Sequence, residues 1–257
     1  MPDVSFSVED DIGRVTLESP PVNGFTHEFM HDLHDALEAA RDAGPAVLLV
    51  ESAIDGMFSA GGDLSWYVNA DDETLQNFVS FMHKTFRTLE RLPMVTVAAI
   101  DGHCLAGGFE LALACDQRIV SDGNWQLGCT ETEIGAMPGG GGTQRLPREV
   151  GRGTALDMIL NARRVPPEEA ADLGLVQRTV EPAEFQSEVQ EYAERLANGP
   201  HRAYAAAKQA VTQGTEMSLD EGLAYEQELE YGLFETADFE EGLDAFVNDR
   251  DPEFRGE

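Results

Sequence analysis

Short apolar runs alternate with longer helical patterns along most of this chain, and this alternation limits the possible folds more than any other feature. The runs have the length of buried strands, whereas the segments between them place apolar residues three and four positions apart. We predict a hairpin of 4–8 and 12–17, strands over 46–50, 94–100, 117–120 and 176–180, and helices over 26–41, 72–91, 107–115, 142–161, 168–173 and 183–197. Strands alternating with helices indicate an α/β fold with parallel strands.

The pattern changes near residue 198. Three helical segments, 200–213, 218–234 and 237–249, follow without an intervening strand. We therefore divide the chain into a core of residues 1–197 and a C-terminal helical region of residues 198–257. Three amphipathic helices are too thin to enclose a core of their own, so we expect this region to pack on the core or on a neighbouring subunit.

The charge balance is extreme, with 48 acidic and 17 basic residues and a formal net charge of −31. The acids are dispersed through the helical patterns, and such a surface repels itself unless salt screens it. We therefore expect a protein from a salt-adapted source. Nucleic acid and anionic membranes are poor partners for this surface.

The chain offers no sign of membrane insertion or export. No stretch approaches 18 apolar residues, and the N-terminus lacks a basic segment followed by an apolar block. The three cysteines, Cys104, Cys115 and Cys129, form no Cys-x-x-Cys pair, so we expect free thiols in a reducing, cytoplasmic compartment.

Three segments indicate a site for carbonyl chemistry: residues 58–64, 98–111 and 130–139. The first two are glycine-rich turns between an apolar run and a helical pattern, where bare backbone N–H groups can face an oxygen. The second and third each add a glutamate, Glu110 and Glu131. Two backbone donors and two carboxylates suit an oxyanion hole with a general acid and base.

Other motifs are weaker. His27-Glu28-Phe29-Met30-His31 matches the zinc-protease pattern His-Glu-x-x-His, with His34 one turn further. These histidines lie opposite the apolar face of the predicted helix, so we expect them in solvent and expect no metal. The glycines of 139–142 are not followed by the residues of a phosphate-binding loop, and no Gly-x-Ser-x-Gly elbow occurs.

Taken together, the segments resemble the enoyl-CoA hydratase/isomerase, or crotonase, family. The resemblance rests on Phe58–Leu64, on Ala98–Asp116 with its Gly-Gly-x-Glu-Leu-Ala-x-x-Cys-Asp course, and on Leu127–Leu146; Asp238–Phe254 also fits. The resemblance implies a spiral of β–β–α turns followed by a helical region that assembles trimers, often paired into hexamers.

The resemblance also implies roles for individual residues. The N–H groups of Gly62 and Gly107 would bind the thioester carbonyl oxygen, while Glu110 and Glu131 would act in catalysis. Substrate would contact Ser59, Ala60, Gly61, Gly62, Asp63, Leu64, Gly107, Gly108, Pro138 and Gly139. We predict addition of water to a trans-2-enoyl-CoA, with coenzyme A entering only as part of the substrate and with no metal or further cofactor. Trp66, Tyr67 and Met137 flank these segments as candidate acyl-pocket residues or ordinary core.

Two alternatives stay open. The loop Pro20-Pro21-Val22-Asn23 resembles the isomerase branch, which shifts a double bond from C3 to C2, although that branch usually lacks the counterpart of Glu110. A non-catalytic acyl-CoA-binding protein on the same scaffold is the other. Ser65 stands where a lysine is frequent, so Lys208, Arg202 or Arg118 are the candidates for contacting the coenzyme A phosphates.

Overall fold

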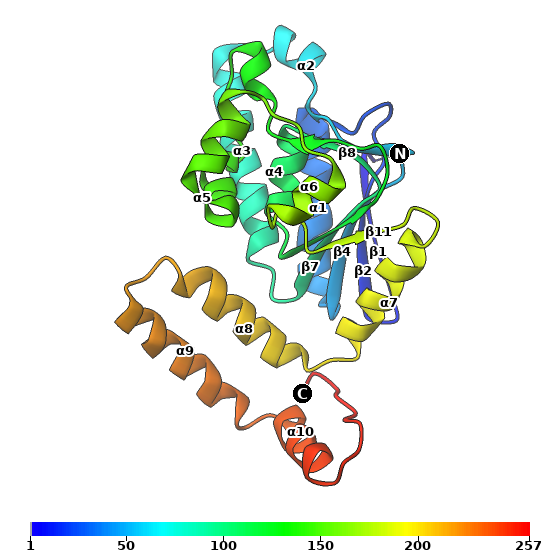
Figure 1. Cartoon of the computed structure of the whole chain (residues 1–257), viewed down its shortest axis with the longest axis vertical. Coiled ribbons are helices and arrows are strands. Elements are labelled where there is room, and N and C mark those ends of the chain that lie inside the picture. The colour runs from blue at the N-terminus through cyan, green and yellow to red at the C-terminus, as the bar shows by residue number, and fades with distance from the viewer. Residues whose placement is uncertain (1) are drawn as a thin grey trace.

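A six-stranded sheet forms the centre of the computed structural model, which describes residues 2–257 (Figure 1). Its strand order is β1-β2-β4-β7-β9-β11, and every pairing is parallel except that of β1 with β2. The strands are β1 (Val4–Glu9), β2 (Ile12–Leu17), β4 (Val47–Ser52), β7 (Val95–Ile100), β9 (Gln117–Ser121) and β11 (Arg178–Val180). The predicted hairpin and strands are confirmed, with β11 shorter than expected.

A second layer of short strands turns the sheet into a spiral. After β4, β7 and β9 the chain forms β5 (Gly56–Ser59), β8 (Gly102–Leu105) and β10 (Leu127–Gly128), which pair in parallel, while β3 (Gly24–Phe25) pairs with β6 (Gly61–Gly62). A helical segment follows β3, β6, β8 and β10. This is the spiral of β–β–α turns that the resemblance implied. The sequence pattern did not predict these strands because two to four residues cannot show apolar alternation.

The helices of the spiral are α1 (His27–Ala43), α2 (Leu64–Asn69), α3 (Asp72–Glu90), α4 (Gly107–Leu113), α5 (Gly142–Leu160), α6 (Pro167–Asp172) and α7 (Phe185–Ala197). Helix α1 shows how sequence sets such an element: Thr26 caps it by accepting from Phe29 N, and Gly44 ends it in the left-handed conformation. Helix α5 was predicted as continuous, but the φ of +77° at Gly151 breaks it into two pieces.

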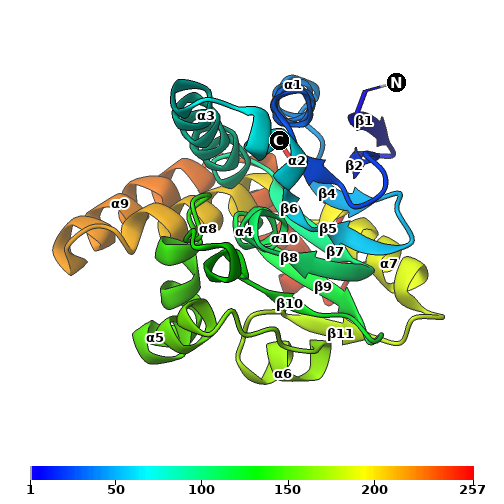
Figure 2. The same ribbon diagram turned by 90° about the horizontal axis from the view of Figure 1, so that it is seen from above.

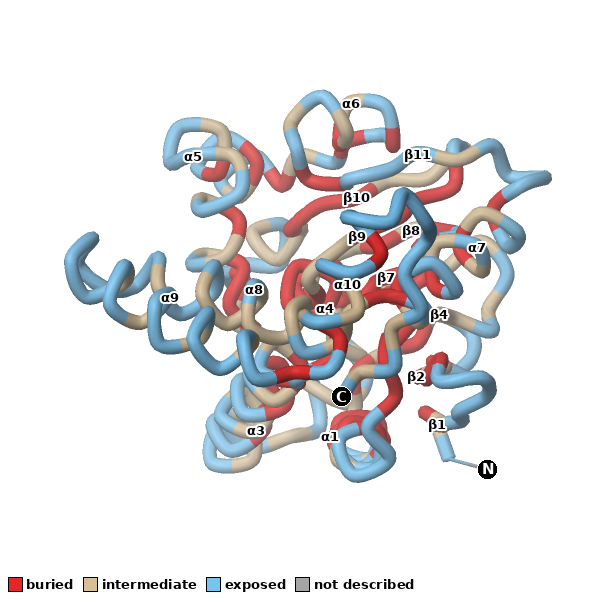
Figure 3. Tube along the Cα trace, turned by 90° about the horizontal axis from the view of Figure 1, so that it is seen from below, coloured by how far each residue is buried: buried red, intermediate tan, exposed pale blue. Residues whose placement is uncertain are grey.

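Side chains of β4 alternate between two cores. Leu48 and Val50 face the larger core with helices α1, α3 and α4, whereas Val47 and Leu49 face a smaller core beneath α7. Figure 1 shows these helices on opposite sides of the long strands, and Figure 3 shows the buried course of the strands. Burial on both faces explains why the strands are uninterrupted apolar runs.

The C-terminal region consists of α8 (His201–Gly214), α9 (Leu219–Leu233) and α10 (Ala237–Val247). Helices α8 and α9 pack against each other and extend beyond the spiral (Figure 2), and neither contains a buried residue. Lys208 fastens α8 to the sheet by bonds to Asp116 and to Met94 O, at 2.8 and 2.9 Å. No helix within residues 2–257 has the length and apolar character needed to cross a bilayer.

Candidate active site

The three segments predicted to form the site meet at one cavity of about 310 Å³. Gly62 comes from β6, Gly107 and Glu110 from the start of α4, and Glu131 from a short 3₁₀ helix, Glu131–Ile134. All four line the cavity, although 69 residues separate Gly62 from Glu131. The spiral joins them because each successive turn places its short strand beside the previous one.

The two candidate oxyanion-hole segments touch through their backbones. Gly61 has a φ of +81°, and a Cβ atom there would lie 2.5 Å from Gly107 N. Ala106, which precedes Gly107, has an unusual φ of +49° for a residue with a side chain. Gly107 begins α4, so its N–H has no acceptor within the helix. The strained turn thus orients an N–H group at the wall of the cavity.

The other predicted contact residues divide into two groups. Ala60, Leu64 and Gly139 line the cavity. The rest do not line it, and they are Ser59, Gly61, Asp63, Gly108 and Pro138.

Ser59 and Asp63 have clear supporting roles. Ser59 Oγ accepts from Gly61 N at 3.0 Å and donates to Asn23 O at 2.8 Å. The Asp63 carboxylate caps α2 by accepting from Ser65 N and Trp66 N. Ser59 Oγ and Asp63 Oδ1 therefore hold the backbone of the wall in place.

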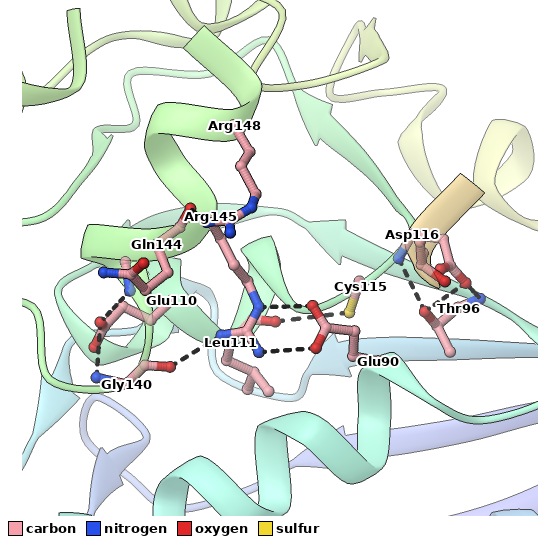
Figure 4. A network of polar contacts seen from close by, with 12 residues as sticks. Glu90, Thr96, Glu110, Leu111, Cys115, Asp116, Gly140, Gln144, Arg145 and Arg148 are labelled. Atoms are coloured by element: carbon pink, nitrogen blue, oxygen red, sulfur yellow. Dashed lines mark hydrogen bonds and ion pairs between the residues drawn. The ribbon is translucent and has the colours of Figure 1, made fainter. Parts of the chain in front are cut away.

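Glu110 is almost completely buried, with 1% of its surface exposed. Its Oε1 accepts hydrogen bonds from Gly140 N at 2.8 Å and from Gly142 N at 2.7 Å (Figure 4). A Cβ atom on Gly140 would lie 2.8 Å from Oε2 of the same carboxylate. Gly140 and Gly142 therefore allow the backbone to approach the carboxylate, and their N–H groups bind Glu110 instead of forming a phosphate-binding loop.

Glu131 presents a different environment. Both of its carboxylate oxygens are enclosed, and neither accepts a hydrogen bond from residues 2–257. Buried carboxylate oxygens without partners are rare and point to a functional role.

The pKa values of Glu110 and Glu131 are both shifted, and each depends on the other carboxyl. Burial, and then the charge of Glu131, raises the pKa of Glu110 well above its ordinary value, while the N–H groups of Gly142 and Gly140 act in the opposite direction. Burial is also the main cause that raises the pKa of Glu131. Two such groups take up and release protons as a pair, so their titration belongs to both residues together.

The remaining wall is largely apolar. Tyr67 and Met137 line the cavity as expected, but Trp66 packs against Phe78 and Tyr67 instead. Burial and the charges of Glu110 and Glu131 raise the pKa of Tyr67 to about 12. Sequence reasoning did not identify the other wall residues, Phe25, Val79, Met82, Ala106, Thr130, Glu133, Ile134 and Ala136. The spacing of Val79 and Met82 indicates that they share one face of α3. It does not indicate which cavity that face lines.

The histidine motif forms no metal site in the structure. His27 and His31 are exposed, with 3.2 Å between their Nε2 atoms. The prediction that His34 also faces solvent was wrong: His34 is buried, and its ring packs edge-on against Phe81. Within residues 2–257, no three His, Cys, Asp or Glu side chains are arranged to hold a metal ion.

Two of the three candidate phosphate-binding side chains form hydrogen bonds or ion pairs with other residues of the protein. Arg118 is buried and donates to the carbonyls of Leu175, Ala112 and Cys115. Lys208 is committed to Asp116 and Met94 as described above. Arg202 is exposed but does not line the cavity. Arg118 and Lys208 are therefore engaged in contacts within the protein, and which cation contacts coenzyme A stays a prediction.

The loop that resembles the isomerase branch has a structural role. The buried Asn23 side chain donates to Ser52 Oγ and to Phe58 O, at 2.8 and 2.9 Å, and accepts from Ser19 N. Asn23 thus braces the segment that leads to Gly62. This role accounts for the asparagine without isomerase chemistry.

Comparisons with known proteins agree with this geometry. The sequence profile of the enoyl-CoA hydratase/isomerase family matches residues 7–257. The chain is 34% identical over 236 residues to a crotonyl-CoA hydratase of Syntrophomonas wolfei, covering 91% of this chain and 90% of that protein. It is 36% identical over 241 residues to the mitochondrial methylglutaconyl-CoA hydratase of Mus musculus, covering 91% and 76%.

A solved structure is also closely similar. The enoyl-CoA hydratase of Geobacillus kaustophilus superposes with a TM-score of 0.97 at 36% identity, covering 100% of this chain and 98% of that one. The predicted fold class is confirmed. Because the family profile and these relatives match nearly the whole sequence, the chain belongs to the enoyl-CoA hydratase/isomerase family.

Proposed function

We propose that this protein adds water across the double bond of a trans-2-enoyl-CoA to give a 3-hydroxyacyl-CoA. One observation carries the proposal: Gly62, Gly107, Glu110 and Glu131 line the same cavity. Relatives named as hydratases at 32–38% identity support this activity. The isomerase alternative has no better support, since Glu110 is present and Asn23 has its own structural role.

In the proposed reaction, the N–H groups of Gly62 and Gly107 stabilise the negative charge that develops on the thioester oxygen. Each such donor contributes about 3–4 kcal/mol to transition-state stabilisation. The water oxygen bonds to C3 as Glu110 accepts a proton from it, and Glu131 delivers a proton to C2. A proton then passes from Glu110 to Glu131, which restores the charged Glu110 and the protonated Glu131 for the next turnover. These steps need no metal or cofactor beyond the thioester itself.

The test uses crotonyl-CoA with purified protein in molar salt. We expect loss of the conjugated thioester absorbance and formation of 3-hydroxybutyryl-CoA, identified by mass. In the Glu131→Gln variant, turnover should fall by about 10²–10⁴-fold, because the proton donor is lost. Turnover of 3-enoyl-CoA by wild-type protein that does not hydrate crotonyl-CoA would instead establish the isomerase. Tight binding of coenzyme A thioesters without any turnover would indicate the non-catalytic alternative.

We further propose that the C-terminal helices assemble the chain into a trimer or a dimer of trimers. Large apolar residues of α10 support this, since Leu243, Phe246 and Val247 are 53%, 86% and 79% exposed. A protein covers such a patch by association. The dispersed acidic residues support adaptation to high salt, and the three buried, unpaired cysteines support a reducing cytoplasm.

A further inference from the structure

The position of Glu110 depends on a loop with no side chains of its own. Among residues 2–257, its carboxylate accepts hydrogen bonds from the N–H groups of Gly140 and Gly142 alone, within the run Gly139–Gly142. Gly141, between these two donors, has a φ of +110°. Glycine has more conformational freedom than any other residue, so contacts from outside the loop must hold the two donors in place.

Arg145 supplies such a contact. Its Nη1 donates to Gly140 O at 3.1 Å, and its backbone N donates to Gly141 O at 2.8 Å. The carbonyl of Gly140 belongs to the peptide group that joins Gly140 to Gly141. That peptide group lies between the two whose N–H groups bind Glu110. A Cβ atom on Gly141 would collide with Arg145 Nη1, so the guanidinium packs directly on the loop.

Glu90, the last residue of α3, holds the guanidinium in turn. Arg145 Nε and Nη2 bond Glu90 Oε1 and Oε2 at 3.0 and 3.2 Å, a two-pronged arrangement that restricts both position and orientation (Figure 4). The Arg145 side chain is only 14% exposed. A continuous set of hydrogen bonds therefore runs from α3 through Arg145 and Gly140 to Glu110, across 55 residues of sequence between Glu90 and Arg145.

We propose that Arg145, oriented by Glu90, is a positioning residue that holds the Gly140–Gly142 loop and thereby sets the place of the Glu110 carboxylate. The inference rests on the proposed hydration, in which Glu110 binds the attacking water. Neither Arg145 nor Glu90 lines the cavity where substrate would bind. Their loss should consequently change turnover much more than substrate binding.

The decisive variant is Arg145→Met, which keeps an unbranched side chain but removes all three donated bonds. We expect kcat to fall by on the order of 10²-fold, the effect of a small misplacement of a reacting group, with KM changed less than about threefold. The acid limb of the kcat–pH profile, which reports the base Glu110, should also move to higher pH, because the charge of Arg145 lowers the pKa of Glu110.

Arg148→Met is the matched control. Arg148 lies one turn further along α5, is 62% exposed and donates to Gln144 O, with no contact to the glycine loop. The same loss of charge there should leave kcat and the pH profile near those of the wild type. Equal effects of the two substitutions would overturn the positioning role and indicate a general effect of charge.

Conservative variants distinguish a positioning role of Arg145 from a role in folding alone. Lysine keeps the charge but cannot bond Glu90 twice and Gly140 at once. Arg145→Lys should therefore keep a pH profile near that of the wild type while kcat falls, and Glu90→Gln should lower kcat to a smaller degree. Adding Glu90→Ala to Arg145→Met should cost little more than Arg145→Met alone, because the two residues act as one unit.

The outcomes distinguish this inference from the proposed function. If wild-type protein does not hydrate crotonyl-CoA, the proposed function itself is wrong. If the wild type hydrates it and Arg145→Met or Arg145→Lys keeps full kcat while melting at a lower temperature, Arg145 is only structural and the positioning role is wrong.

Discussion

At the scale of single residues, burial of the Glu110 carboxylate lowers the stability of the fold when that group is charged, although the group serves the proposed chemistry. Its carboxylate is buried beside a second buried carboxyl, and two backbone N–H groups offset only part of the cost of charging it. A raised pKa in the folded state means that the folded protein binds this proton more tightly than the unfolded chain. Its contribution to stability is therefore complete below the unfolded pKa and is lost as pH rises through the folded pKa.

We predict that Glu110→Gln melts at a higher temperature than the wild type at pH 8, and that this advantage shrinks at pH 5, where the wild-type carboxyl is largely protonated. The amide oxygen of glutamine can still accept from Gly140 and Gly142, so the loop retains its bonds. Thermal melts of both proteins at the two pH values provide the measurement. An advantage that does not depend on pH would argue against a raised pKa at Glu110.

Gly61 offers a second prediction at this scale. Gly61→Ala should push the segment of Gly62 away from Gly107, because its Cβ would lie 2.5 Å from Gly107 N, and should lower kcat by on the order of 10²-fold. Gly174→Ala is the control: Gly174 has a similar φ of +77°, but no atom lies within 4 Å of the added Cβ. Both variants carry backbone strain and should melt earlier, but only Gly61→Ala should lose activity.

At the scale of elements, the C-terminal helices are unusual because they leave large apolar residues exposed, among them Leu243 and Phe246 of α10. Replacing Leu243 and Phe246 of α10 by glutamate should convert the assembled protein to a monomer, measured by light scattering after size exclusion. Val8→Glu is the control, since Val8 is also an exposed apolar residue, at 49%, but lies on the edge strand β1. A wild-type protein that is already monomeric would contradict the proposed assembly.

For the molecule as a whole, the net charge of −31 is the dominant property. The Debye length falls from about 10 Å at 0.1 M salt to about 3 Å at 1 M, so repulsion between dispersed acidic residues weakens strongly over this range. We predict that the melting temperature rises between 0.1 and 1 M KCl, measured by differential scanning calorimetry. A melting temperature that stays constant or falls would show that acidic repulsion does not limit stability.

Local patterns in the sequence were sufficient for the elements and for the family. Apolar runs predicted the strands of the main sheet, helical periodicity predicted the long helices, and glycines beside Glu110 and Glu131 marked the candidate site. These features are readable because strand and helix periodicity, and the need for glycine where backbones approach closely, act between near neighbours in the chain.

Tertiary structure alone decided what depends on distant residues. It buried His34 against Phe81, paired Lys208 with Asp116 and Arg118 with the carbonyl of Leu175, and packed Trp66 against Phe78. It also joined Arg145 to Glu90 and raised the pKa of Glu110 through burial and Glu131. No sequence pattern carries this information, because burial and ion pairing are set by the space that all elements enclose together.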